Sequence, residues 1–154
     1  MSIYIREVKP QDRPVLVELV SMMIGDSNRE EVANIIVEDF YTNALFTTFV
    51  SEAEGKVTSY LSYKREPFEG SNQVGEIVFL GTKESSRKQG HGHNLVKHIE
   101  EFSKTKGIRK LYVKTSPANT RAVCFWIKNG YQFEARMKDF SCDNVDAYFL
   151  GKLL

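Results

Sequence analysis

Two glycines one residue apart, in the stretch RKQGHGHN at residues 87–94, constrain the fold of this chain more than any other feature. The run before them, VGEIVFLGT at 74–82, is the most apolar strand-like run, and the LVKHIEEFSKTKG that follows has the apolar spacing of a helix. Glycine at a helix entrance either makes a turn or lets a ligand approach the backbone. The sequence therefore predicts a buried strand, a glycine turn and a helix in succession.

The glycine turn has the composition of an anion site. Unpaired N–H groups at a helix start and the helix dipole favour an anion, and glycine lets a phosphate reach the main chain. We expect a phosphate-binding turn at Gly90 and Gly92; the alternative is a helix entrance packed tightly on a neighbour. A dinucleotide motif needs a third glycine where Leu95 stands, and a P-loop needs Lys and Ser or Thr after Gly92, where the chain has His-Asn. Neither of these two classes fits.

Size and charge limit the remaining possibilities. With 154 residues, 42% hydrophobic and 27% charged, the chain suits one domain spanning residues 1–154. The net charge of +1 comes from 21 basic and 20 acidic residues that are mixed along the chain, so neither nucleic acid nor a membrane is an expected partner. The first residues lack a long apolar stretch, which predicts a cytoplasmic protein. Cys124 and Cys142 are isolated and are expected to be reduced thiols, with no disulfide and no metal site.

Hydrophobic periodicity predicts the order β-α-α-β-β-β-α-β-α-β-β, a mixed sheet with helices on its faces. In the second helix, Ser27 with Glu30 fits a capping box. Glu54-Gly55 predicts a hairpin turn. The apolar face expected for that second helix consists of Val32, Ile35, Ile36 and Phe40, and the expected strands cover residues 3–8, 45–53, 56–64, 74–82, 110–115, 131–140 and 145–153.

Two motifs resemble those of the GNAT superfamily of N-acetyltransferases. Arg87-x-x-Gly90-x-Gly92, directly after a strand, is similar to its pyrophosphate-binding motif. The order of elements also matches from end to end. The resemblance implies an α/β (α+β) GNAT fold, a mixed, mostly antiparallel sheet of about seven strands flanked by about four helices. The second motif, an Asn, an Ala, an aromatic pair, then Gly and an aromatic, is matched by Asn119, Ala122, Phe125, Trp126, Gly130 and Tyr131.

The resemblance implies acetyl-CoA as cosubstrate and no metal cofactor. The N–H groups of residues 87–92 would hold the pyrophosphate, and the pantetheine arm would pair with main chain through Thr82. The N–H near Leu80 would polarise the thioester carbonyl, as an oxyanion hole does. The expected coenzyme-binding residues are Leu80, Thr82, Arg87, Lys88, Gln89, Gly90, His91, Gly92, Asn119, Ala122, Phe125 and Trp126.

Glu76 is the expected catalytic base, with Leu80 as the second catalytic position. The strand EIVF at 76–79 resembles the one that carries the base in histone-type lysine acetyltransferases. An amine with a pKa near 10.4 arrives protonated and must lose a proton before it attacks a thioester, and apolar neighbours make a carboxylate readier to take it. Glu76 lies about 13 Å along the strand from Leu80, so a bound water would close part of the gap. The alternative for Glu76 is a carboxylate that faces solvent or pairs with a lysine.

Trp126 departs from the family pattern. Many members have a tyrosine there, whose hydroxyl protonates the leaving thiolate, and indole cannot do so. We therefore expect the thiolate to take its proton from water. Trp126 and Phe125 are otherwise expected to be either core aromatics or contacts of the coenzyme.

The charged and imidazole side chains near the turn have smaller expected roles. The side chains of His91 and His93 are expected to point outward, and His98 to be solvated. Lys83, with Arg87 and Lys88, adds positive charge beside the expected phosphates; the alternative for Lys83 is a solvated basic loop.

The sequence determines the amine that accepts the acetyl group less well than any other part of the expected function. A flexible loop is expected at 66–73. The expected function is transfer of acetyl to a primary amine by direct attack, and protein lysines, peptide N-termini, polyamines and amino sugars stay open as acceptors. A non-catalytic acyl-CoA-binding sensor or regulatory module of the same fold is the alternative, and a homodimer is left open. The acidic residues expected near the acceptor groove are Asp26, Glu30, Glu31, Glu66 and Glu69.

Overall fold

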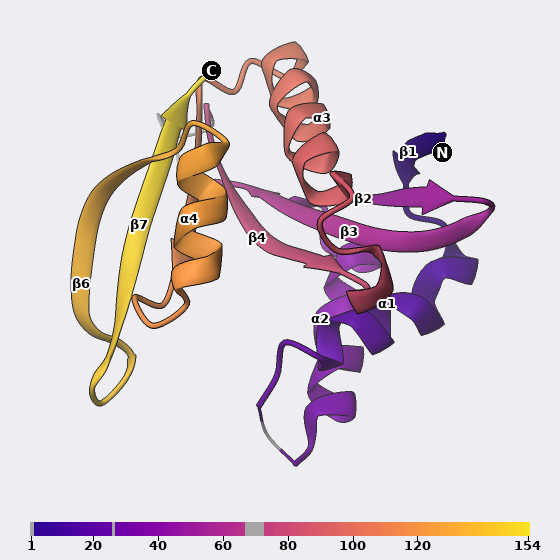
Figure 1. The fold of residues 1–154 in the computed structure, drawn as a ribbon, viewed down its shortest axis with the longest axis horizontal. Coiled ribbons are helices and arrows are strands. Elements are labelled where there is room, and N and C mark those ends of the chain that lie inside the picture. Colours follow the sequence, from indigo (N-terminus) through magenta and orange to yellow (C-terminus); the bar gives the residue numbers. More distant parts are fainter. Residues whose placement is uncertain (1, 26, 67–72) are drawn as a thin grey trace. The chain divides into compact units, whose positions relative to one another are not determined.

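The computed structural model describes residues 2–25, 27–66 and 73–154 (Figure 1). Asp26, Glu69 and most of the loop expected at 66–73 lie outside the described residues. None of the helices in the described ranges is long and apolar enough to cross a membrane. The elements are β1 (Ile3–Glu7), a 3-10 helix (Pro10–Asp12), α1 (Arg13–Ser21), α2 (Arg29–Thr42), β2 (Phe46–Ala53), β3 (Lys56–Arg65), β4 (Val74–Thr82), a second 3-10 helix (Glu84–Ser86), α3 (His91–Thr105), β5 (Lys110–Thr115), α4 (Thr120–Lys128), β6 (Gln132–Cys142) and β7 (Val145–Leu153).

The strands form a seven-stranded mixed sheet in the order β1-β2-β3-β4-β5-β7-β6. The β4–β5 pair is parallel, whereas β1–β2, β2–β3, β5–β7 and β6–β7 are antiparallel. This architecture confirms the predicted fold class. By its contacts the chain forms two compact units, unit 1 (residues 1–64 and 79–99) and unit 2 (residues 65–78 and 100–154), and each is described by itself.

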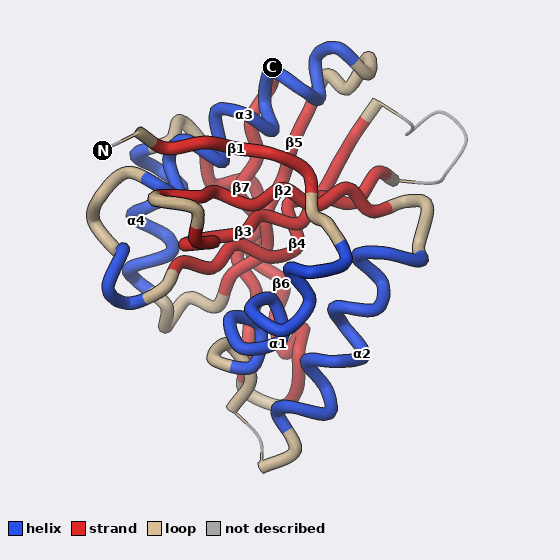
Figure 2. Tube along the Cα trace, turned by 90° about the vertical axis from the view of Figure 1, so that its right-hand side faces the viewer, coloured by secondary structure: helices blue, strands red, loops and turns tan. Residues whose placement is uncertain are grey.

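In unit 1, apolar side chains of α1 and α2 pack on β2 and β3, and the two helices lie side by side (Figure 2). Successive strand residues point to opposite faces. Val50 therefore joins this core, while Phe49 points the other way and meets the His98 ring of α3 at 4.6 Å. The core residues are Leu16, Leu19, Val20, Ala33, Val37, Phe40, Val50, Val57 and Tyr60.

The hairpin between β2 and β3 forms as predicted. Glu54 and Gly55 have φ values of 53° and 73°. Two successive positive φ values define the turn type whose twist matches that of paired strands. Glycine removes the steric cost at the second position.

The expected face of α2 is right for Phe40 and Ile36, which pack in the core of unit 1, and wrong for Ile35. The buried residues are Ala33, Val37 and Phe40, whereas Ile35 is 65% exposed. The helix begins after Asn28, which forms no side-chain capping bond, so the capping box expected at Ser27 is wrong as well. The run VANIIV contains apolar residues on adjacent faces, and packing against α1 and β2 decides which of them is buried.

In unit 2, α4 lies beside β7 (Figure 1). Leu111 and Val113 of β5 are buried, and by strand alternation Tyr112 and Lys114 point to the opposite face. β6 is the edge strand, and all of its residues are exposed. Its register with β7 shifts after Phe133 and again after Met137.

A buried ion pair fixes the passage from β1 to α1. Asp12 is 4% exposed, and its two carboxylate oxygens accept hydrogen bonds from Arg6 at 2.7 and 2.9 Å. One of them also accepts from the Lys9 N–H at 2.7 Å. The hydrogen bonds from Arg6 hold the pKa of Asp12 below its usual value.

We predict that Asp12→Asn lowers the free energy of unfolding by about 2 kcal/mol, because it removes one of the two carboxylates that pair with the Arg6 guanidinium and leaves only Glu52. Glu38→Gln is the matched control. Its ion pair with Arg13 is exposed at both ends, so the loss should stay below about 1 kcal/mol. Urea unfolding at pH 7 measures the free energy of unfolding of both variants. Equal losses in the two would contradict a stabilising role for the buried Arg6–Asp12 ion pair.

Candidate active site

The turn that connects β4 to α3 has the backbone geometry expected of an anion site. Lys88 and Gly90 have φ values of 62° and 86°, and Gln89 between them is not left-handed. In turns of this kind, successive N–H groups can face one side and form the concave nest that holds an anion. Nothing lies within 4 Å of the position that a Cβ on Gly90 would take, and the helix begins with the bond from the Asn94 N–H to the Gly90 carbonyl at 2.9 Å. The turn thus fits a phosphate group, although phosphate binding itself stays a prediction.

Side chains of the turn are tied to its own backbone. The Arg87 Nε donates to the Thr82 carbonyl at 3.3 Å, and the Gln89 amide donates to the Ser85 carbonyl at 3.1 Å. These two hydrogen bonds fix the backbone conformation directly after β4. On β4 itself, Gly81 leaves room for the ring of Tyr60, whose nearest carbon lies 2.6 Å from the position of an added Cβ. Leu80 and Thr82, on either side of it, are half-buried.

His91 does not point outward, contrary to expectation. Its side chain is 2% exposed, and Nδ1 lies 3.1 Å from the Ser51 hydroxyl and 3.0 Å from the Thr58 hydroxyl. The Thr58 hydroxyl donates to the Ser51 carbonyl at 3.0 Å, so its oxygen is left to accept, which assigns the proton of the neutral ring to Nδ1. The imidazole therefore anchors the first turn of α3 to β2 and β3, while a coenzyme contact by the His91 main chain stays a prediction.

The prediction for His98 is wrong, whereas His93 is exposed as expected. The His98 ring is half-buried and packs edge-on against Phe49. Burial lowers the pKa of the His98 imidazole. The helix pattern placed His98 on a polar face, but the sheet beneath α3 covers that position.

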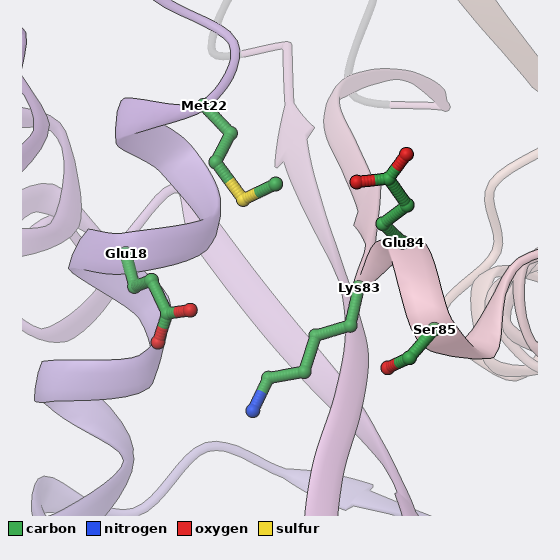
Figure 3. A pocket seen from close by; sticks show the side chains of 5 residues that line it. All are labelled: Glu18, Met22, Lys83, Glu84 and Ser85. Carbon is green, nitrogen blue, oxygen red and sulfur yellow. The ribbon is translucent and has the colours of Figure 1, made fainter.

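Lys83 borders a hollow in unit 1 of about 490 Å³. Its walls come from α1 and from the 3-10 turn that follows β4 (Figure 3). The side chain of Lys83 extends from the end of β4 toward α1, so its positive charge faces this hollow. The lining residues are Glu18, Met22, Lys83, Glu84 and Ser85.

Glu76 lies in unit 2, in the half of β4 that pairs with β5. It is 7% exposed, and its register partner is Tyr112. One carboxylate oxygen lies 2.9 Å from the Lys114 Nζ, and the other lies 3.3 Å from the Tyr112 hydroxyl. Glu76 thus has the lysine partner of the alternative interpretation, in a buried position. The apolar neighbours expected around it form only part of its surroundings.

Tyr112 and Lys114 were not foreseen as neighbours of Glu76. A usable signal was present, because in KLYVKT the apolar Leu111 and Val113 alternate with the polar Tyr112 and Lys114. A parallel neighbour of the Glu76 strand would present that polar face beside the carboxylate. The register that pairs them depends on the sheet order, which local periodicity does not supply.

The second motif forms the start and core of α4. The Asn119 side-chain oxygen accepts a hydrogen bond from the Ala122 N–H at 3.1 Å, so Asn119 caps the helix. Trp126 is 6% exposed and packs edge-on against Phe125 and Tyr131 at 5.1 and 5.0 Å. This arrangement matches the expectation of core aromatics. Contact of these residues with a coenzyme stays a prediction.

Comparison with known families agrees with these features. A profile of the Acetyltransferase (GNAT) family matches residues 17–131, and the chain belongs to this family. The predicted family is thereby confirmed. The family uses acetyl-CoA as cosubstrate, and no group of three or more His, Cys, Asp or Glu residues in the described ranges is arranged to hold a metal ion.

The individual proteins similar to this chain have low sequence identity to it. The chain is 32% identical over 82 residues to "GCN5-related N-acetyltransferase 6, chloroplastic" of Arabidopsis thaliana, a match that covers 53% of this chain and 28% of that protein. A putative GNAT-family acetyltransferase of Desulfovibrio desulfuricans has a similar structure, with 19% identity, a TM-score of 0.84 and 99% of both chains covered. The ribosomal-protein-alanine N-acetyltransferase of Brucella melitensis has 21% identity and a TM-score of 0.83, with 98% of this chain and 99% of that one covered. The two structures establish likeness of fold.

We predict that Gly90→Ala weakens CoA binding by about tenfold or more, because a methyl group would stand in the nest where a phosphate is expected. Gly55→Ala is the matched control in the same unit, since it too has positive φ and nothing within 4 Å of an added Cβ. Both variants should lose about 1 kcal/mol of stability from backbone strain. Calorimetric titration with CoA should separate them, and equal affinities would contradict a phosphate site at Gly90.

We predict that stability falls as the pH decreases below about 6.5. Burial lowers the pKa of His91 from its ordinary 6.5, so the unfolded chain binds a proton at higher pH than the folded chain does. The contribution of this imidazole is complete above the unfolded pKa and is lost as the pH drops toward the folded one. In His91→Asn, the unfolding free energy measured in urea from pH 7.5 to 5.5 should change less than in the wild type. His93→Asn, at an exposed position, should keep the wild-type slope, and an unchanged slope in His91→Asn would refute the assignment.

Proposed function

We propose that this chain transfers the acetyl group of acetyl-CoA to a primary amine by direct attack, with Glu76 as general base. The observation that carries the proposal is the buried Glu76 carboxylate on β4, the strand that leads into the glycine turn. Leu80 and Thr82 follow on the same strand, at even spacing from Glu76. The family supports the use of acetyl-CoA, and the proposal adds the roles of the residues.

The reaction requires that the amine lose one proton and that the acetyl carbon exchange its bond to sulfur for a bond to nitrogen. Glu76 would accept the proton of the arriving ammonium group. The free amine nitrogen would then bond to the acetyl carbon while the carbon–sulfur bond breaks, and the leaving thiolate would take a proton from water, because Trp126 cannot donate one in the place of a tyrosine.

Lys114 has a defined part in this scheme. Its ammonium group lies 2.9 Å from one oxygen of Glu76, so this ion pair positions the carboxylate. The proton that Glu76 accepts must leave it before the next turnover.

The turn at residues 87–92 would hold the pyrophosphate through its N–H groups. The coenzyme supplies the activated thioester when it is bound. Gly90 keeps the nest open, and the buried imidazole of His91 would keep the helix start in place. The N–H near Leu80 and the main chain of Thr82 are proposed to meet the thioester and the pantetheine arm.

The acceptor is identified by mass spectrometry of an amine panel incubated with acetyl-CoA: a lysine peptide, an alanine-terminated peptide, spermidine and glucosamine. The alanine-terminated peptide is included because the similar Brucella melitensis protein is an alanine N-acetyltransferase of a ribosomal protein. We expect one of the four to gain an acetyl group. CoA binding without any acetylated amine would instead support the sensor module.

We predict that Glu76→Gln lowers kcat/KM for that amine about 100-fold or more, because an amide cannot act as the base. The affinity for CoA should be unchanged. Glu101→Gln, at an exposed position on α3, is the matched control and should retain wild-type activity. Steady-state kinetics with the fastest amine of the panel provides the measurement, and full activity in Glu76→Gln would exclude Glu76 as the base.

A further inference from the structure

The hydroxyl of Tyr112 lies between two carboxylates of unit 2. Its oxygen is 2.5 Å from Glu66 Oε1 and 3.3 Å from Glu76 Oε2. Glu66 directly follows β3, and its N–H donates to the Val74 carbonyl at 3.1 Å, which holds it beside the start of β4. The Tyr112 ring stacks on Phe149, with ring centres 6.3 Å apart and planes inclined by 17°. The phenol is therefore held in place by the sheet rather than by the carboxylates alone.

The two contacts differ because a phenol has a single proton. The short distance assigns that proton to the bond with Glu66. The lone pairs of the Tyr112 oxygen are then left for Glu76, and an ionised Glu76 has no proton to offer them. Once Glu76 is protonated, it can donate to Tyr112. The arrangement thus fits the state of Glu76 that follows removal of a proton from the amine.

Alternative exits for that proton are limited near Glu76. The Glu76 side chain is 10% exposed, so its access to water is small. Lys114, its ion-pair partner, is a donor without an acceptor atom while it is charged. Glu66 is an acceptor at a half-buried position, where it can pass a proton to solvent. Burial and the two carboxylates raise the pKa of Tyr112, so its hydroxyl keeps a proton to donate.

We propose that Tyr112 relays the proton taken up by Glu76 to Glu66, as a positioning and proton-transfer residue of the proposed reaction. The O–H bond of Glu76 breaks as an O–H bond forms on Tyr112, and the former O–H bond of Tyr112 breaks as one forms on Glu66. Tyr112 ends with one proton, Glu76 is again a carboxylate, and Glu66 releases the proton to water. The relay rests on the proposed function of Glu76.

Tyr112→Phe and Glu66→Gln test the relay with acetyl-CoA and the fastest amine of the panel. The first removes the hydroxyl and keeps the ring that stacks on Phe149. The second leaves Tyr112 with no carboxylate at its far end. Both should lower kcat about tenfold or more, with little change in KM for the amine or in affinity for CoA. Tyr148→Phe, also in unit 2, removes a hydroxyl outside the relay and should keep wild-type kcat.

Two further readouts distinguish proton transfer from a structural role. In mixtures of H₂O and D₂O, the dependence of kcat on the deuterium fraction should be curved in the wild type, because more than one proton moves, and linear in Tyr112→Phe. Added imidazole should restore part of kcat in Tyr112→Phe by accepting the proton directly, and should not accelerate the wild type.

The results separate failure of the relay from failure of the proposed function. Wild-type kcat in Glu66→Gln, together with an inactive Glu76→Gln, would overturn the relay and leave the base in place, whether or not Tyr112→Phe folds. A straight deuterium dependence in the wild type would overturn it as well. Full activity in Glu76→Gln, or no acetyl transfer by the wild type, would overturn the proposed function and the relay with it.

Discussion

The register between β4 and β5 is the constraint on which unit 2 depends most. It places Glu76 opposite Tyr112, and strand alternation then puts Lys114 on the same face and Leu111 in the core. A slip of one residue would bring Leu111 or Val113 beside the Glu76 carboxylate and would bury Tyr112. The register between β4 and β5 thus produces both the polar surroundings of Glu76 and the apolar face of β5.

Unit 1 combines two opposite demands at the start of α3. The turn needs an open backbone at Gly90, where no side chain is tolerated without strain. The residue directly after it, His91, is among the most buried polar side chains and is bonded to two neighbouring strands. The free N–H groups of the turn keep a fixed position only if the start of α3 is fixed. The hydrogen bonds of the His91 imidazole to the two strands fix it.

Local patterns predicted much of this fold, because alternation and turn residues act over a few positions. The bounds of β4, β5 and β7 agree with the sequence predictions to the residue. The positions of Ile35 and His98 were mistaken, since a helix with apolar residues on adjacent faces is oriented by its partners in the fold.

The candidate site was predictable only in part for the same reason. Glu76 and the glycine turn stand out in the sequence, because a carboxylate in an apolar run and paired glycines before a helix are local features. The bond between Tyr112 and Glu66 joins residues 46 positions apart. It exists because the sheet places β5 next to β4, and neither local spacing nor composition encodes that neighbourhood.

The irregular pairing of β6 affects how this protein meets other copies of itself. β6 is long and fully exposed at the edge of the sheet, and such an edge can accept a further strand. Its two register shifts interrupt the ladder with β7, and Asp139 between them has a φ of 50°. Charged side chains such as Arg136 and Lys138 also line the strand. A fibril grows by adding strands to a straight and regular sheet edge. The register shifts and charged side chains of β6 make this edge unsuitable for that growth.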